Sequence, residues 1–489
     1  MGECPRLSVA WPQTRRSIEF CDMLPPSSNA RISSDSSGCA MTMRTVLWRL
    51  SLCLCLCLCL CLWDSHSTQA QNNNNNGIGG IRIDAEGVVS AIAPLKESVA
   101  AAKKRQLAYR TANLSEPLAT ATESRRVSLK QLDEQLAEIA KAGGEVPAEL
   151  KYLAGLTRID YVVVDRDGHD IALVGPAEGF APDLQGRMRG VTSGRPVLNL
   201  EDLLVAWRTV YSGTTVVTCS IDPTQEGLAA FNAFISQPLV AQPSAAGRMF
   251  NTMATKLGRQ VISVSGVPHD THFAVVLVEA DLRMKRIAIG EDPSGVRGVT
   301  SHLSLMRLGD AASSRWWFVP LYDPLEANAD RSLYHLSGQR LQLLGQDEFT
   351  NSQGQRSNVP FNKLGTTKFV QQFTAKIPEL TVAHPAFAEL QNLFDWMVVC
   401  TLIRRHQLDA SIQWQPMVLG DAKLWPTKSY PVPTGVDSVA ATNRVGRTIL
   451  GLVGGVELNA DSVISKTSPL AAGAAPSLPA RHETRAWND

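Results

Sequence analysis

The spacing of apolar residues along the chain predicts several amphipathic helices. Between residues 128 and 142, leucine, isoleucine and alanine recur at intervals of three and four, which places them on one face of a helix. Ser128 before this segment and Gly143 after it are typical helix caps. The same reasoning predicts helices over residues 95–112, 147–153, 199–211, 244–257, 362–374 and 385–406, and one that begins at Asp222-Pro223.

Runs of β-branched and aromatic residues between turn signals predict the strands. Hairpins are expected to turn at residues 84–87, 166–169 and 337–338, and further strands are expected over residues 214–221, 260–264, 315–320 and 447–458. Residues 345–360 are polar and rich in Gly, Asn and Gln, which predicts a loop.

Residues 270–288 fit two templates. The run of valine and leucine at 275–278 alone would suit a strand, but Phe273, Leu277, Met284 and Ile287 lie on one face of a helix, which we favour. Helices and strands thus interleave along the chain. The pattern predicts an α+β fold, a mixed sheet with packed helices, in two closely associated domains that span 81–240 and 241–465.

An export signal is predicted near the amino terminus. Leucine and cysteine alternate over residues 52–62, so this short core is apolar throughout. Arg44 and Arg49 precede it, and small residues follow it, which places cleavage between Ala70 and Gln71. Because the core is shorter than the ~20 residues that span a bilayer, no stable membrane span is expected after cleavage. The mature protein is therefore expected in the periplasm, on the cell surface or in the medium.

The remaining segments flank the predicted folded part. A signal peptide acts from the amino terminus, so translation is expected to begin at Met41 or Met43 rather than at Met1. The predicted segments are a mis-annotated leader over 1–40, the signal peptide over 41–70, a flexible Asn-rich linker over 71–80 and a disordered Ala/Pro/Ser-rich tail over 466–489.

Charge and cysteine content narrow the function classes. The chain has 47 Lys and Arg against 46 Asp and Glu, a net charge of +1, which gives no electrostatic basis for binding nucleic acid. After signal cleavage, Cys219 and Cys400 are the cysteines of the mature chain. Both lie in apolar runs, so two buried free thiols are expected, although an oxidising compartment would allow them to pair.

Several segments carry a resemblance to a known family. They start at Gly79, Thr271, Arg315 and Phe387, and the likeness covers most of residues 79–457. Taken together, they resemble an exported protein family of unknown function found in Planctomycetes. The resemblance implies an exported protein, and it carries over no catalytic residue.

The candidate metal ligands are His269, His272 and Glu279. Two imidazoles three residues apart share a helical face if the helix begins there, and a carboxylate could complete the site. However, the His-Glu-x-x-His pattern of zinc proteases is absent. The alternative interpretation is a helix start with Asp270 as N-cap and both histidines exposed.

Two other groups of residues suggest a function. The charges at Glu279, Asp281, Arg283, Lys285 and Arg286 could form an acid–base cluster or an anion-binding stripe. The alternative is a solvated helix face with local ion pairs.

Trp316 and Trp317 are neighbours in a predicted strand, so they point to opposite faces. One is expected in the core. The other could be an exposed platform for carbohydrate or for a partner, or could pack under a loop or a helix.

These observations leave three hypotheses. No nucleophile elbow, P-loop or dinucleotide fingerprint is present, and no cofactor is expected. The leading hypothesis is a non-enzymatic binding or structural module of the cell envelope whose partner is an envelope protein or glycan. The alternatives are a metal-dependent hydrolase centred on His269, His272 and Glu279, and a carbohydrate-binding module that uses Trp316 or Trp317.

Overall fold

A computed structural model describes residues 77–93, 95–237, 246–307, 313–439, 451–471 and 476–489. The predicted leader and signal peptide lie outside these residues. Residues Asn72–Asp489 form one compact unit. Its mixed sheets and packed helices confirm the predicted α+β class, and the domain boundary at residue 240 stays a prediction.

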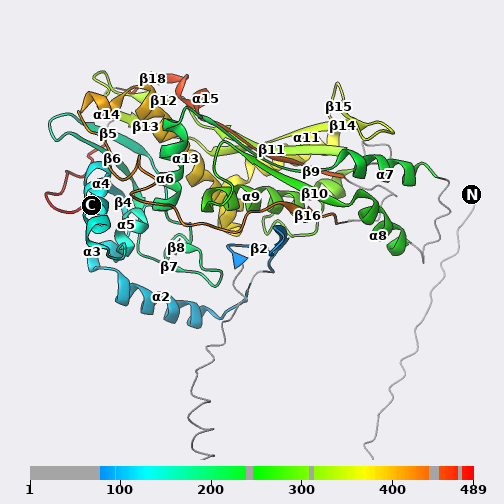
Figure 1. Cartoon of the computed structure of the whole chain (residues 1–489), viewed down its shortest axis with the longest axis horizontal. Helices are drawn as coiled ribbons and strands as arrows, with labels where there is room; N and C mark the ends of the chain where they lie inside the picture. Colours follow the sequence, from blue (N-terminus) through cyan, green and yellow to red (C-terminus); the bar gives the residue numbers. More distant parts are fainter. Residues whose placement is uncertain (1–76, 94, 238–245, 308–312, 440–450, 472–475) are drawn as a thin grey trace, which may run out of the picture. The chain divides into compact units, whose positions relative to one another are not determined.

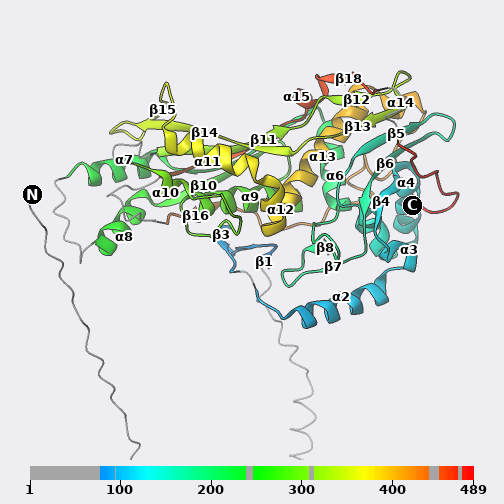
Figure 2. The same ribbon diagram turned by 180° about the vertical axis from the view of Figure 1, so that it is seen from behind.

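The strands form two large sheets and a small one (Figures 1 and 2). The ten-stranded sheet has, in spatial order, β1 (Gly77–Ile78), β2 (Ile81–Ile83), β3 (Val88–Ala91), β16 (Gly435–Asp437), β10 (Arg259–Ser265), β9 (Val216–Pro223), β17 (Gly451–Asn459), β11 (Ser313–Leu321), β14 (Arg340–Thr350) and β15 (Arg356–Asn358). The seven-stranded sheet has β18 (Thr467–Pro469), β12 (Leu325–Ala327), β13 (Leu333–His335), β5 (Tyr161–Asp165), β6 (Asp170–Ala177), β4 (Thr122–Ser128) and β19 (Trp487–Asn488). The small sheet pairs β7 (Phe180–Pro182) with β8 (Met188–Gly190).

The longer helices lie in the segments predicted to be helical. They are α2 (Val99–Asn113), α4 (Leu129–Ala142), α6 (Leu200–Tyr211), α7 (Gln225–Ile235), α8 (Ala246–Leu257), α9 (His272–Ala288), α11 (Leu364–Ala375) and α13 (Pro385–Arg405). The shorter ones are α3 (Glu116–Ala119), α5 (Ala148–Lys151), η1 (Leu153–Gly155), α10 (His302–Leu305), α12 (Ile377–Ala383), α14 (Leu408–Ser411) and α15 (Ala460–Ile464).

Two buried helices form the centre of the fold. Helix α9 contacts β9 and β17 of the large sheet, and it also contacts α6 and α13. Helix α13 is long and apolar enough to cross a membrane, but 94% of its apolar window is buried inside the protein. A helix that is apolar on all sides and enclosed by other elements is a core helix. Both helices contribute side chains to the candidate site.

Cys219 on β9 and Cys400 on α13 are free and buried, as expected. Burial raises the pKa of both thiols, which makes them poor nucleophiles.

The predicted hairpin around residues 337–338 is wrong in its pairing. The turn exists, and Gly338 has φ +96 with no room for a Cβ beside the Asp323 backbone nitrogen. However, β13 pairs with β5 in one sheet, and β14 pairs with β11 in the other. The chain therefore crosses from one sheet to the other at this turn.

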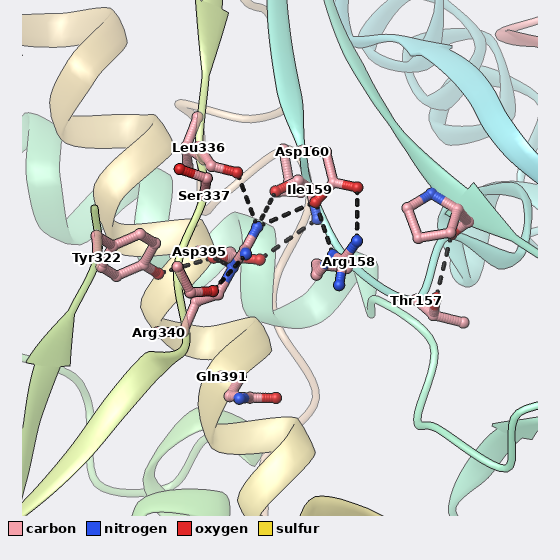
Figure 3. Close-up of polar contacts among 12 residues, drawn as sticks. Thr157, Arg158, Ile159, Asp160, Tyr322, Leu336, Ser337, Arg340, Gln391 and Asp395 are labelled. Atoms are coloured by element: carbon pink, nitrogen blue, oxygen red, sulfur yellow. Dashed lines mark hydrogen bonds and ion pairs between the residues drawn. The ribbon is translucent and has the colours of Figure 1, made fainter. Parts of the chain in front are cut away.

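A buried ion pair fixes this crossing point (Figure 3). Arg340, at the start of β14, has its guanidinium Nε 3.2 Å from Asp395 Oδ1 of α13. Its Nη2 donates to the carbonyls of Ile159 and Leu336 at 2.8 and 3.1 Å. The Tyr322 hydroxyl donates to the same Asp395 carboxylate at 2.7 Å. Both sheets are thus attached to α13 at one point.

Three further local predictions need correction. Strand β9 continues through Pro223, and Thr224 rather than Asp222 caps α7, because its hydroxyl accepts from the Gly227 amide at 2.9 Å. The predicted loop over 345–360 contains the end of β14 and all of β15. The predicted disordered tail over 466–489 ends in β19, which pairs with β4.

Candidate functional site

Helix α9 brings two of the three predicted metal ligands, His272 and Glu279, to one cavity. Thr271 caps the helix, since its hydroxyl accepts from the Ala274 amide at 3.3 Å. The segment forms a helix rather than a strand because nearly every residue after His272 is buried, and a helix can be enclosed on all sides. His272 and Glu279, seven residues apart, lie on the same side of α9.

The cavity has a volume of about 280 Å³ and a mostly polar wall. Helix α9 contributes His272 and Glu279 to this wall, and α6 contributes Asp202 near its start. Further side chains come from the turn before β8, from α13 and from the segment around residue 430. The wall also includes Lys151, Tyr152, Met188, Val197, Asn199, Glu201, Val275, Val276, Asn392, Lys428 and Tyr430.

His272 is paired with a buried carboxylate. Its Nδ1 lies 2.9 and 3.0 Å from the two carboxylate oxygens of Asp202. Burial alone would lower the pKa of His272, but the charge and hydrogen bond of Asp202, with a further contribution from Glu389, raise it to about 9. The imidazole is therefore protonated at neutral pH, and Nδ1 donates to Asp202.

A second buried cluster joins one arginine to two carboxylates. Arg187 Nη2 donates to Glu279 Oε2 at 2.7 Å, and Arg187 Nε forms an ion pair with Glu389 Oε2 at 2.7 Å. All three side chains are 12% exposed or less. Burial raises the pKa of Glu389, and the nearby Glu279 adds to that effect, whereas Arg187 and His272 lower it.

The amino-terminal hairpin closes over this cluster. The Gly80 amide donates to Glu279 Oε1 at 2.9 Å. A Cβ on Gly80 would lie 2.5 Å from that same oxygen and 2.7 Å from Arg283 Nη2, so a larger residue would have to displace the ends of these two side chains. Gly79, the residue before Gly80, lines the cavity beside this cluster.

The three predicted metal ligands do not come together. His269 is exposed on the turn before α9, whereas His272 and Glu279 line the cavity with the partners described above. Within the residues that the structure describes, no group of three His, Cys, Asp or Glu side chains could hold a metal ion. The alternative interpretation, a helix capped by Asp270 with both histidines exposed, also needs correction. Thr271 caps the helix, and His272 is partly buried.

The charges further along α9 divide into two sets. Arg283 and Arg286 form local ion pairs with Asp292, although these side chains are only partly exposed. In contrast, Asp281 and Lys285 are buried, and Lys285 Nζ donates to Asp281 Oδ2 at 3.0 Å and to the Ile221 carbonyl at 2.8 Å. Burial raises the pKa of Asp281 to about 6 despite the lowering effect of Lys285. This pair joins α9 to β9 and does not line the cavity.

The two tryptophans on β11 behave as alternation predicts. Trp316 is fully buried, and its ring contacts His302 and Phe369 edge to face. Trp317 is half-buried on the other face, where the Arg315 guanidinium lies 5.6 Å from its ring centroid. Only Trp317 could contact a ligand, and the cavity wall contains neither residue.

Sequence reasoning missed Asp202, Arg187 and Glu389. Asp202 had a visible local role as an acidic residue in the first turn of a helix capped by Asn199, where it interacts favourably with the helix dipole. Its pairing with His272, 70 residues away, has no local signal. The same holds for Arg187 and Glu279, which are 92 residues apart.

Comparison with known proteins supports an uncharacterised family. Residues 219–302 match a family model described as protein of unknown function (DUF1598). This segment contains α9, and hence both His272 and Glu279. No curated protein and no solved structure matches the chain.

Proposed function

We propose that the protein is an exported, non-enzymatic binding module that holds a small polar molecule in the cavity around His272. The observation that carries this proposal is that the charged groups of the cavity are paired in advance. His272 is paired with Asp202, and Arg187 with Glu279 and Glu389. Groups held in this way present fixed hydrogen-bonding atoms, which lowers the cost of ordering the site when a ligand binds.

The imidazole of His272 is better suited to binding than to base catalysis. Among the described residues that line the cavity there is no serine, threonine or cysteine, the usual nucleophiles of covalent catalysis. A general base must be able to accept a proton near the working pH, but His272, with a pKa of about 9, is already protonated at neutral pH. Its Nε2–H is a donor for a ligand oxygen rather than a base.

Charge balance and size indicate the class of ligand. The wall carries four acidic side chains and four basic ones, counting His272 as a cation. Such a balance gives no net attraction for a polyanion or a polycation. At roughly 30 Å³ per water molecule, a volume of about 280 Å³ corresponds to about nine waters. A monosaccharide, a polyol or a zwitterionic amino acid has a suitable size and charge.

A thermal-shift panel tests this proposal. The purified chain is heated with neutral monosaccharides, polyols and zwitterionic amino acids, and with dicarboxylates and diamines as charged comparators. We expect at least one uncharged or zwitterionic probe to raise Tm saturably. His272→Gln and Glu389→Gln should abolish that rise. His269→Gln, which changes an exposed residue outside the cavity, should preserve it.

Two outcomes would overturn the proposal. One is a panel in which only the charged comparators stabilise the protein, or none does. The other is a stabilising probe whose effect survives in both His272→Gln and Glu389→Gln.

A further inference from the structure

A separate cavity lies beside the turn that joins the two sheets, and the turn residues Gly338 and Gln339 line it. It has a volume of about 160 Å³. Three arginines line it: Arg158, which precedes β5, Arg195, which precedes α6, and Arg340. Gln339, Thr381 and Gln391 supply most of the remaining polar wall. Figure 3 shows Arg158, Arg340 and Gln391 around this region.

Two of the three guanidinium groups are neutralised by carboxylates. Arg158 donates from Nε and Nη2 to the two oxygens of Asp160 at 2.6 and 2.8 Å. Arg340 pairs with Asp160 at 3.1 Å and with Asp395 at 3.2 Å. The carboxylates of Asp160 and Asp395 are therefore already paired with Arg158 and Arg340.

Arg195 differs from its neighbours because no carboxylate of the described residues lies within ion-pair distance of it. Its Nη2 donates to Gln391 Oε1 at 2.8 Å, and its Nη1 donates weakly to Thr381 Oγ1 at 3.4 Å. Its Nε is buried and has no hydrogen-bond partner among the residues that the structure describes. A guanidinium has five N–H donors, so three of them have no acceptor within the described part of the chain.

The cavity therefore has an excess of one positive charge, from three guanidinium groups against two carboxylates. Burial lowers the pKa of Arg195, and the neighbouring Arg158 and Arg340 lower it further, although Asp395 and Asp160 act in the opposite direction. Arg195 is partly buried, and a cation withdrawn from water with unused donors is stabilised when an anion accepts from it.

We propose that this cavity binds a small oxyanion, with Arg195 as its principal ligand and Arg158 at its solvent side. Arginine suits this role because its planar donors match the oxygens of phosphate, sulfate or carboxylate in pairs. The volume corresponds to about five water molecules at roughly 30 Å³ each, which is enough for an inorganic anion or a terminal carboxylate. The Arg158 side chain is 42% exposed, so an anion can reach the cavity from solvent.

This site does not depend on the proposed function of the first cavity. The residues that line the two cavities are different, and each can be tested without the other. The two cavities nevertheless use neighbouring residues of α13. Gln391 lines the cavity of Arg195, and Asn392 lines the cavity of His272. Asn392 also donates to the Pro196 carbonyl, next to Arg195, at 3.3 Å.

Thermal unfolding with defined salts tests the proposal. The purified chain is titrated with sodium phosphate, sodium sulfate or sodium acetate, each compared with sodium chloride at equal ionic strength. We expect at least one oxyanion to raise Tm saturably by about 2 °C or more beyond chloride. The salt with the largest effect on Tm identifies the chemical group that the cavity binds. A preference for acetate indicates the carboxylate of a larger molecule.

Two variants and a control make the test specific. Arg195→Gln should abolish the oxyanion effect. Arg158→Gln, at the solvent side, should weaken apparent affinity about tenfold, the loss expected for one charge-assisted hydrogen bond. Arg248→Gln removes the same charge from an exposed position on α8, which lines neither cavity, and should behave like the wild type.

The proposal is overturned if none of the three salts exceeds chloride, since Arg195 is then simply hydrated. It is also overturned if Arg195→Gln retains the effect, or if Arg248→Gln loses it to the same degree. Should Arg195→Gln fail to fold, Arg158→Gln decides the matter, and an unchanged affinity in that variant would contradict the proposed site.

Discussion

The paired state of His272 predicts a specific dependence of stability on pH. Folding raises its pKa from an ordinary value of 6.5 to about 9, mainly because the Asp202 charge and hydrogen bond outweigh burial. A shift of one pKa unit corresponds to 1.36 kcal/mol, so the difference amounts to about 3 kcal/mol. Because the folded protein holds this proton more tightly than the unfolded chain, the contribution is fully present below pH 6.5 and is lost as pH rises through 9.

The assay compares the wild type with His272→Gln by urea unfolding at about pH 6 and at about pH 9.5. Other groups titrate in this range too, but their contribution cancels when the free energy of unfolding of the variant is subtracted from that of the wild type. We expect the difference to shrink by about 3 kcal/mol between the two pH values. For Asp202→Asn, the difference in free energy of unfolding from the wild type should shrink in the same way.

His269→Gln is the matched control, because it removes an exposed histidine three residues away. The free energy of unfolding of this control should differ from that of the wild type by the same amount at both pH values. If the difference for His272→Gln does not change with pH, or if it grows as pH rises, then the imidazole is not held as a cation. His272 could then accept a proton at neutral pH and act as a general base.

Two further predictions concern stability. Lys285→Met should destabilise the protein by about 3–5 kcal/mol in urea unfolding, because it leaves the buried carboxylate of Asp281 without its cation. The double variant Lys285→Met/Asp281→Leu should recover much of this loss. If it recovers none, the proposed pairing is refuted. Trp487→Ala should cost about 3 kcal/mol, since this ring is buried where β19 pairs with β4, and an effect near zero would show instead that the carboxy-terminal strand does not dock.

Much of the local structure could be predicted because its signals are local. Ser128 caps its helix as expected, since a cap depends on a side chain and an amide two or three residues away. The cap at Asp222 was wrong because Thr224, two residues on, offers an equivalent signal. A polar side chain followed by helix formers predicts that a helix exists more reliably than it predicts the residue at which the helix begins.

Pairing between distant elements could not be predicted. The turn at Gly338 was correct, but a turn signal does not say whether the two strands that it joins pair with each other. Here each strand finds a better partner in a different sheet, and Arg340 with Asp395 fixes the crossing.

The candidate site shows the same limit. The sequence pointed to His272 and Glu279 because they lie on one short segment of unusual composition. It suggested metal binding because two histidines and a carboxylate were all that could be seen. Their partners, Asp202 and Arg187, change the chemistry from metal ligation to preformed ion pairs. They become neighbours only when α6 and β8 pack near α9.

The most direct test of the central claim is isothermal titration calorimetry with the uncharged or zwitterionic probe that gives the largest thermal shift. Mass spectrometry of the recovered probe accompanies it. We predict saturable binding of one molecule per chain, loss of the heat signal in His272→Gln, and recovery of the probe chemically unchanged. Heat without saturation, binding that survives in His272→Gln, or conversion of the probe to a product would contradict a non-enzymatic binding cavity around His272.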